Sequence, residues 1–571
     1  MFIETVPNRN SPPAVLLRRS FRRHGKTVKE TLANLTRWPL NVVAGLERLL
    51  QGKTLVAFED VFAIERTMPH GHVAAVLGMI RRLGVDALIA SRRCRERDLV
   101  VAMIAERLLH PCSKLATTRL WATTTLGEEL GVADADVDEL YAALDWLGER
   151  QERIEGKLAK RHLRDGMLVL YDVTSSYYEG RTCPLARPGY NRDEKKGRPI
   201  IVYGVLTDGE GRPVAVEVYA GNTGDPTTVP DQVETLRERF ALERVVLVGD
   251  RGMLTETQIE RLRAHPQLGW ISALRTPATR KLVHSGDLQL SLFDQQNLAE
   301  IRSDEFPGER LVVCYNPLLA EDRRRTREEL LLATEKELEK IQRAVSRRTK
   351  TPLTKDEIAL RVGRVINRFK VAKHYRLTIE DARFQWRRDE EAIAQEQALD
   401  GIYVIRTSEP AERIPTDDTV RNYKRLALVE RLFRTLKGID LRIRPIYHRL
   451  DPRVRSHIFL CLLAYYVEWH MRKVWAPLLF DDEELDHRRP RRDPVALAQP
   501  SPSAKRKKRE RTTDDGLPVH SFQTLLAHLA TYSRNICRTK TGKHSATTIQ
   551  YPDLSPLQVR AFQLLEACPV R

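Results

Sequence analysis

Two aspartates each follow an apolar run typical of a strand, a position in which a carboxylate can serve metal chemistry. Asp172 follows the run 167–171, and Asp250 follows the run 245–248 across one glycine. Because functional groups gather at the carboxyl ends of strands in an open α/β sheet, we expect both at one edge. Carboxylates suit Mg²⁺, and two such ions can hold the attacking and leaving oxygens of a displacement at phosphorus. A lone aspartate after a strand more commonly serves a turn.

A third carboxylate, Glu430, lies on a helix that we predict from about Thr419 to Lys437. Tyr423, Glu430 and Lys437 are seven residues apart, so about two helical turns separate each from the next on one face. Such a face offers a possible metal ligand between two groups able to bind phosphate, and Arg425 adds positive charge. A lone helical glutamate is usually solvated or paired.

Four strings make the combination specific: YDVTSSYYEG, GNTGDPTT, VVLVGDRGM and YKRLALVERLFRTLKGIDLRIRPIYHR. Together they resemble bacterial insertion-sequence transposases of the DDE type, in particular the group with an inserted domain between the second Asp and the Glu. The resemblance spans about residues 165–480. It implies a ribonuclease H-like fold in which Asp172, Asp250 and Glu430 are the catalytic, metal-binding triad for two Mg²⁺ or Mn²⁺ ions.

The same group carries a Tyr-x2-Arg-x3-Glu-x6-Lys pattern on its Glu helix. Tyr423, Glu430 and Lys437 match this pattern, whereas Leu426 occupies the Arg position and Arg425 precedes it by one residue. By the resemblance, Tyr423 and Lys437 would bind phosphates of the transposon end. Arg425 is the nearest substitute for the missing arginine, from a neighbouring angle on the helix.

Further candidates for contacts with DNA adjoin these motifs. Arg251 follows the second aspartate, and Arg444 and His448 lie in RPIYHR after the Glu helix. A structural ion pair explains Arg251 equally well, and ordinary surface pairing is the commoner role of an arginine such as Arg444. The polar loop 190–196 is expected near Asp172. Trp386 could stack on an unpaired base, although packing is the commoner role of an aromatic residue.

The composition favours a nucleic-acid partner and excludes several other classes of protein. The net charge is +18, with 42% hydrophobic and 30% charged residues. A positive field suits a polyanion, because neutralised phosphates release counterions. The apolar stretch 458–469 is too short to cross a bilayer, and the first residues carry no secretion signal. Scattered cysteines without a CxxC pair argue against zinc fingers and disulfides and fit a cytoplasmic, nucleoid-associated bacterial protein.

The pattern of elements predicts an α/β protein: a ribonuclease H-like mixed sheet flanked by helices, with an inserted subdomain and an all-α N-terminal domain. Helical spacing dominates before residue 164, and strand-like runs begin at 167 and resume at 401. A long charged helix at 323–348, with a heptad-like apolar stripe, indicates the insertion. The predicted division is a basic N-terminal segment (1–50), a helical DNA-binding domain (51–164), the first part of the core (165–275), the insertion (276–395), the second part of the core with the Glu helix (396–482), a basic disordered linker (483–517) and a small helical tail (518–571).

The resemblance implies a Mg-dependent transposase that cleaves double-stranded DNA at the terminal inverted repeats of an insertion sequence. The freed ends would then be joined to target DNA at the same site, without a covalent enzyme intermediate. Synapsis of two ends implies at least a homodimer on DNA. Two alternatives stay open: a ribonuclease H-like DNA nuclease without strand transfer, and a catalytically inactive DNA-binding remnant.

Overall fold

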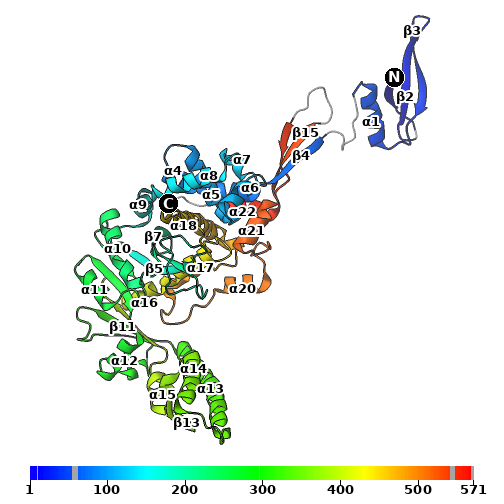
Figure 1. Ribbon diagram of the computed structural model, residues 1–571. Helices are drawn as coiled ribbons and strands as arrows, with labels where there is room; N and C mark the ends of the chain where they lie inside the picture. Colours follow the sequence, from blue (N-terminus) through cyan, green and yellow to red (C-terminus); the bar gives the residue numbers. More distant parts are fainter. Residues whose placement is uncertain (10, 54–61, 295, 540–546, 567–571) are drawn as a thin grey trace. The chain divides into compact units, whose positions relative to one another are not determined.

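The computed structural model describes residues 1–9, 11–53, 62–294, 296–539 and 547–566. The chain divides into two compact units, Met1–Pro69 with Tyr532–Asp553, and His70–Thr531 with Leu554–Arg571. The second unit holds the large sheet and all the candidate site residues (Figure 1).

The described residues of the first unit form two small antiparallel sheets and one helix. In one sheet β2 lies between β1 and β3, and the hairpin turns through His24 and Gly25, both with positive φ. In the other, β15 lies between β4 and β16. The prediction of a basic segment followed by helices is therefore wrong for residues 62–69, because β4 pairs with a strand more than 460 residues further along the chain. The elements are β1 (Phe2–Val6), β2 (Ala14–Arg23), β3 (Lys26–Asn34), α1 (Leu40–Leu50), β4 (Phe62–Pro69), β15 (Ser533–Thr539) and β16 (Thr547–Gln550).

The second unit is organised around an eight-stranded mixed sheet of order β10-β11-β14-β9-β8-β5-β6-β7. Strands β7, β6 and β5 are antiparallel, and β5, β8 and β9 are parallel. This five-strand arrangement is ribonuclease H-like, and it confirms the predicted fold class. The strands are β5 (Leu168–Tyr177), β6 (Ile200–Asp208), β7 (Pro213–Ala220), β8 (Val245–Val248), β9 (Leu268–Ala273), β10 (Leu298–Ile301), β11 (Arg310–Tyr315) and β14 (Ile402–Thr407).

Helices before the sheet share its core instead of forming a core of their own. The long helix α18 (Asp451–Trp475) is buried along most of its middle, and it packs against α3, α5, α8 and β7 (Figure 1). Apolar side chains of the helical region and of the sheet accordingly belong to one continuous cluster. The helices are α3 (Gly71–Leu83), α4 (Val85–Ile89), α5 (Arg95–Leu109), α6 (Lys114–Leu120), α7 (Leu126–Leu130), α8 (Val137–Gly148) and α9 (Gln151–His162).

The predicted Glu helix is two helices, α16 (Thr416–Lys424) and α17 (Leu426–Lys437), with a break at Arg425. Helix α17 packs on β5 through an apolar face. The other helices near the sheet are α10 (Val229–Glu234), α11 (Glu256–Arg263) and α12 (Thr276–His284), with 3₁₀ helices η1 (Asp225–Thr228), η3 (Leu290–Asp294) and η5 (Ala476–Leu478) and a π-helical turn η2 (Thr235–Arg239).

The chain leaves the sheet after β11, forms the insertion and returns to the sheet at β14. Tyr315 at the end of β11 and Ile402 at the start of β14 are cross-strand partners. It is shorter than predicted, because β10 and β11 extend the sheet. Its own core includes the expected stripe of Leu331, Leu338 and Val345. Trp386 packs edge-on against Tyr375, with ring centroids 5.9 Å apart. The elements are α13 (Pro317–Arg347), α14 (Lys355–Phe369), η4 (Ala372–His374), β12 (Tyr375–Glu380), β13 (Arg383–Arg388) and α15 (Glu390–Gln397).

The segment 483–517 differs from the predicted disordered linker. Lys507, from its basic run, is buried and donates to the carbonyls of Ala476 (2.9 Å) and Leu479 (3.0 Å) and to Glu483 (2.6 Å). Composition could not reveal these long-range partners. None of the described helices is long and apolar enough to span a membrane. The last helices are α19 (Leu485–Arg488), η6 (Arg489–Arg491), α20 (Pro502–Glu510), α21 (Phe522–Ala530) and α22 (Pro556–Glu566).

Candidate active site

Strand register places the two aspartates at the same edge of the sheet. Strands β5 and β8 run parallel, with Leu170 opposite Val248. Asp172 and Asp250 each lie two residues beyond this pair. Asp172 is still within β5, where its partner on β6 is Val205, whereas Asp250 begins the loop after β8. Both side chains are half-buried.

Glu430 comes to this edge on α17, the helix that packs on β5. Its side chain is exposed. The pKa of Asp172 is raised to about 7, mainly by burial; the charges of Asp250 and Glu430 act in the same direction, whereas the Val173 N–H and Arg192 act against it. Asp250 and Glu430 therefore both act electrostatically on Asp172, although the three carboxylates are far apart in the sequence.

Tyr423 faces the same three carboxylates from α16. Burial is the main cause that raises the pKa of its hydroxyl to about 12, and Asp250, Glu430 and Asp172 all raise it further. Arg251 acts in the opposite direction, and its own side chain is exposed. The hydroxyl of Tyr423 is therefore protonated at neutral pH and can act as a hydrogen-bond donor.

Backbone groups hold the two aspartates through one oxygen each. Oδ1 of Asp250 accepts hydrogen bonds from the N–H groups of Gly252 (2.9 Å) and Met253 (2.8 Å). Oδ1 of Asp172 accepts one from the N–H of Val173 (2.7 Å). Within the described part of the chain, no cationic side chain forms an ion pair with either aspartate or with Glu430. Nor do three or more His, Cys, Asp or Glu side chains among the described residues form a ready-made metal site.

Lys437 and Arg444 converge on a carboxylate that sequence reasoning had not singled out. The Asp193 side chain is only 1% exposed, and its Oδ1 accepts from Nζ of Lys437 (3.0 Å) and is paired with Arg444. Its Oδ2 accepts from the N–H of Tyr177 (3.0 Å). Asp193 lies in the polar loop expected near Asp172. Nothing in the sequence indicates its partner, because Lys437 is 244 residues away.

Arg192, the neighbour of Asp193, is the cation that acts on Asp172. Its guanidinium is itself paired with Asp225, with Nη2 2.6 Å from Oδ1. Asp225 belongs to the GNTGDPTT string, so this ion pair joins that string to the polar loop 190–196. The loop 190–196 therefore contributes one cation and one buried carboxylate to the surroundings of the candidate site.

Two other candidates make structural contacts. Arg425, at the break between α16 and α17, donates from Nη1 to the carbonyl of Gly209 (3.0 Å) in the β6–β7 turn. His448 packs between the rings of Tyr141 (6.0 Å between centroids) and His457 (4.8 Å). The pKa of His448 is lowered to about 3, mainly by burial and in smaller part by nearby cations. Contacts of these two residues with DNA stay predictions.

Comparisons with known proteins identify the family. The family described as "Transposase DDE domain" matches residues 165–467, more than half of the chain. A second, "IS1634 family transposase, N-terminal domain", matches residues 3–59. None of the curated proteins compared with the chain matches it. Among solved structures, a piggyBac transposase synaptic complex with hairpin DNA is similar at 10% identity and a TM-score of 0.35, over 80% of this chain and 78% of that one. The chain belongs to the DDE transposases of insertion sequences.

Proposed function

We propose that this transposase cleaves DNA at the ends of an insertion sequence and joins the ends to target DNA, with Asp172, Asp250 and Glu430 holding two Mg²⁺ or Mn²⁺ ions. One observation carries the proposal: strand register brings Asp172 and Asp250 to the same level of the sheet, the charges of Asp250 and Glu430 both raise the pKa of Asp172, and no described cationic side chain is paired with the three carboxylates. The chain's membership of the DDE transposase family supports the assignment.

The donor set fits a hard divalent cation. Carboxylate oxygens are the ligands that Mg²⁺ and Mn²⁺ prefer. Asp172 and Asp250 each use Oδ1 for backbone N–H groups and keep Oδ2 for another partner. Because the described carboxylates do not form a preformed cage, Glu430, the exposed member, would approach the two aspartates as ions bind. Bound ions would supply charge stabilisation at the phosphate under attack.

The protein's own groups would position the DNA around these carboxylates. The protonated hydroxyl of Tyr423 can donate to a phosphate oxygen beside the cluster. Asp193 would orient Lys437 and Arg444, so that their remaining N–H groups bind backbone phosphates. Arg251 is exposed next to Asp250 and would bind a phosphate of the same DNA strand. A net charge of +18 favours long double-stranded partners, and pairing of two ends would require a homodimer.

The test is cleavage of duplexes that carry the terminal repeats, with wild type and Asp250→Asn. Asparagine keeps the oxygen that accepts from Gly252 and Met253 but loses the charge, so we expect cleavage to fall by at least about a hundredfold while DNA binding persists. Asp304→Asn, an exposed residue in the β10–β11 turn, is the matched control. Undiminished Mg²⁺-dependent cleavage by Asp250→Asn would contradict the assignment.

A second substrate separates the alternatives. Pre-cut ends mixed with a target plasmid should become joined to it, because joining uses the same carboxylates as cleavage. Cleavage without joining would indicate a nuclease. Binding without cleavage, in the presence of Mg²⁺ or Mn²⁺, would indicate a remnant that only binds DNA.

A further inference from the structure

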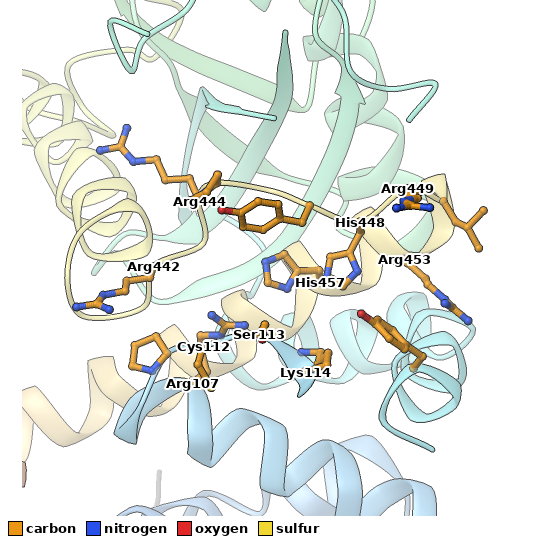
Figure 2. A pocket seen from close by; sticks show the side chains of 15 residues that line it. Arg107, Cys112, Ser113, Lys114, Arg442, Arg444, His448, Arg449, Arg453 and His457 are labelled. Carbon is orange, nitrogen blue, oxygen red and sulfur yellow. The ribbon is translucent and has the colours of Figure 1, made fainter. Parts of the chain in front are cut away.

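A cavity of about 700 Å³ lies among α5, α6, α8, α18 and the segment after α17. Figure 2 shows its side chains, with the His448–His457 pair above Arg107 and Lys114. No carboxylate is among the described residues that line it. Six cationic residues line it, of which Arg444 is paired with Asp193 and Arg453 with Asp145; the others are Arg107, Lys114, Arg442 and Arg449.

Two of these cations are buried without an acidic partner. Lys114 is 5% exposed and Arg107 is 7% exposed, and neither forms an ion pair with any described residue. Arg107 makes one long hydrogen bond, from Nη1 to the carbonyl of Leu441 (3.5 Å). Glu106, the buried carboxylate next to it, contacts His110 instead (3.1 Å). Burying unpaired charge is costly, and an anion in the cavity would offset that cost.

The histidine pair adds a second, independent indication of a ligand. His457 is buried, and its Nε2 lies 3.4 Å from the carbonyl of Ile443. Its Nδ1 is also buried but has no hydrogen-bond partner among the described residues. The ring of His448 lies 4.8 Å away on the same wall. The pKa of Lys114 is lowered to about 7, mainly by burial and in smaller part by the charge of Arg107, as expected for cations crowded together.

We propose that this cavity is a binding site for phosphate groups. Guanidinium and ammonium groups together match phosphate oxygens, and they do so best where water is excluded. The cavity is far larger than one phosphate, and the exposed Arg442 and Arg449 lie on opposite sides of it (Figure 2). A ligand with several phosphates in a row would contact cations along its length. The phosphates belong either to the backbone of DNA or to a free polyphosphate. Binding at this site does not require DNA cleavage.

The experiment is calorimetric titration of the full chain with tripolyphosphate at pH 6.5, below the pKa of Lys114. We expect saturable binding at one site, weakened at least about tenfold by Lys114→Met. Methionine is close in length to lysine and removes an unpaired buried charge, so the variant should fold at least as well as wild type. Lys160→Met, on the exposed side of α9, removes the same charge elsewhere and should bind as wild type does.

A duplex of about 20 base pairs identifies the source of the phosphates. If the duplex displaces tripolyphosphate and loses affinity in Lys114→Met, the phosphates belong to DNA. If only tripolyphosphate binding depends on Lys114, the ligand is a free polyphosphate. Equal binding by wild type and Lys114→Met for both probes would overturn the proposal, as would an equal loss in Lys160→Met. Cleavage by Asp250→Asn is measured separately, so the proposed catalytic function can fail while this site stands.

Discussion

Asp172→Asn should make the protein more stable at high pH. Burial raises the pKa of Asp172 from an ordinary 3.8 to about 7. A carboxyl group with a raised folded-state pKa stays protonated while the unfolded chain ionises, so wild type loses stability as pH rises from about 4 to 7. Asparagine is neutral throughout and keeps the oxygen that accepts from Val173. The variant should therefore match wild type near pH 4 and exceed it at pH 8.

The size of the effect follows from the difference in pKa. Each pH unit of difference corresponds to about 1.36 kcal/mol, which sets an upper bound of roughly 4 kcal/mol at pH 8. Asp172 is only half-buried by surface area, and solvent relaxes around it, so about 2 kcal/mol is the expected gain. Glu155 and Glu468 also have raised pKa values, of about 7. Both residues are present in the two proteins, so the difference between the two pH profiles isolates Asp172.

The assay is thermal unfolding of both proteins between pH 4 and pH 8, with and without Mg²⁺. Divalent ions should stabilise wild type more than Asp172→Asn, because only the folded wild type would offer this carboxylate as a ligand. The reasoning is refuted if the two profiles run parallel over this range, or if the variant melts at a lower temperature at pH 8. Equal stabilisation of the two proteins by Mg²⁺ would show that Asp172 is not a metal ligand. It would not contradict the raised pKa of Asp172.

Three other perturbations have defined outcomes. Asp193→Ala leaves Lys437 without its buried partner, so differential scanning fluorimetry should show a loss equivalent to about 3 kcal/mol, and Asp193→Asn a smaller one; an unchanged melting temperature would be inconsistent with the pairing. Arg251→Gln should reduce the slope of log affinity against log salt by about 1 if the side chain binds one phosphate, and an unchanged slope would exclude that contact. Leu338→Ala should lower the stability of the insertion by about 2–5 kcal/mol and leave DNA cleavage in place at low temperature. If limited proteolysis cuts the insertion of the variant no faster than that of wild type, this expectation is contradicted.

Local patterns were sufficient to predict the centre of the fold. The apolar runs before Asp172 and Asp250 become β5 and β8, because a strand buried on both faces needs a continuous apolar sequence. Because β5 and β8 are parallel neighbours, Asp172 within β5 and Asp250 after β8 lie at the same level of the sheet. The stripe of Leu331, Leu338 and Val345 likewise predicted the helix that forms the core of the insertion. In each case the information lies within a few consecutive turns or residues.

The failures share a different cause, which is dependence on distant partners. Strand β4 forms because β15 pairs with it, and Lys507 is ordered because carbonyls at the end of α18 accept from it. The break at Arg425 is stabilised by the carbonyl of Gly209, a residue 216 positions earlier. Helical periodicity in the sequence cannot show such a break, because Tyr423, Glu430 and Lys437 are seven residues apart whether or not the helix is continuous. A sequence motif specifies residue types, but the positions of those residues in space depend on contacts with residues far away in the sequence.

The charge arrangement around the candidate site argues for an added cation. Three of the nearby basic side chains are paired with other carboxylates: Lys437 and Arg444 with Asp193, and Arg192 with Asp225. With none of these three cations paired with it, Asp172 has a raised pKa, mainly because it is buried and in smaller part because Asp250 and Glu430 are negatively charged. A fold that needed these carboxylates only for stability would pair them with the arginines at hand. Because Lys437, Arg444 and Arg192 are paired with other carboxylates, the three candidate carboxylates keep the negative charge that the proposed metal ions would need.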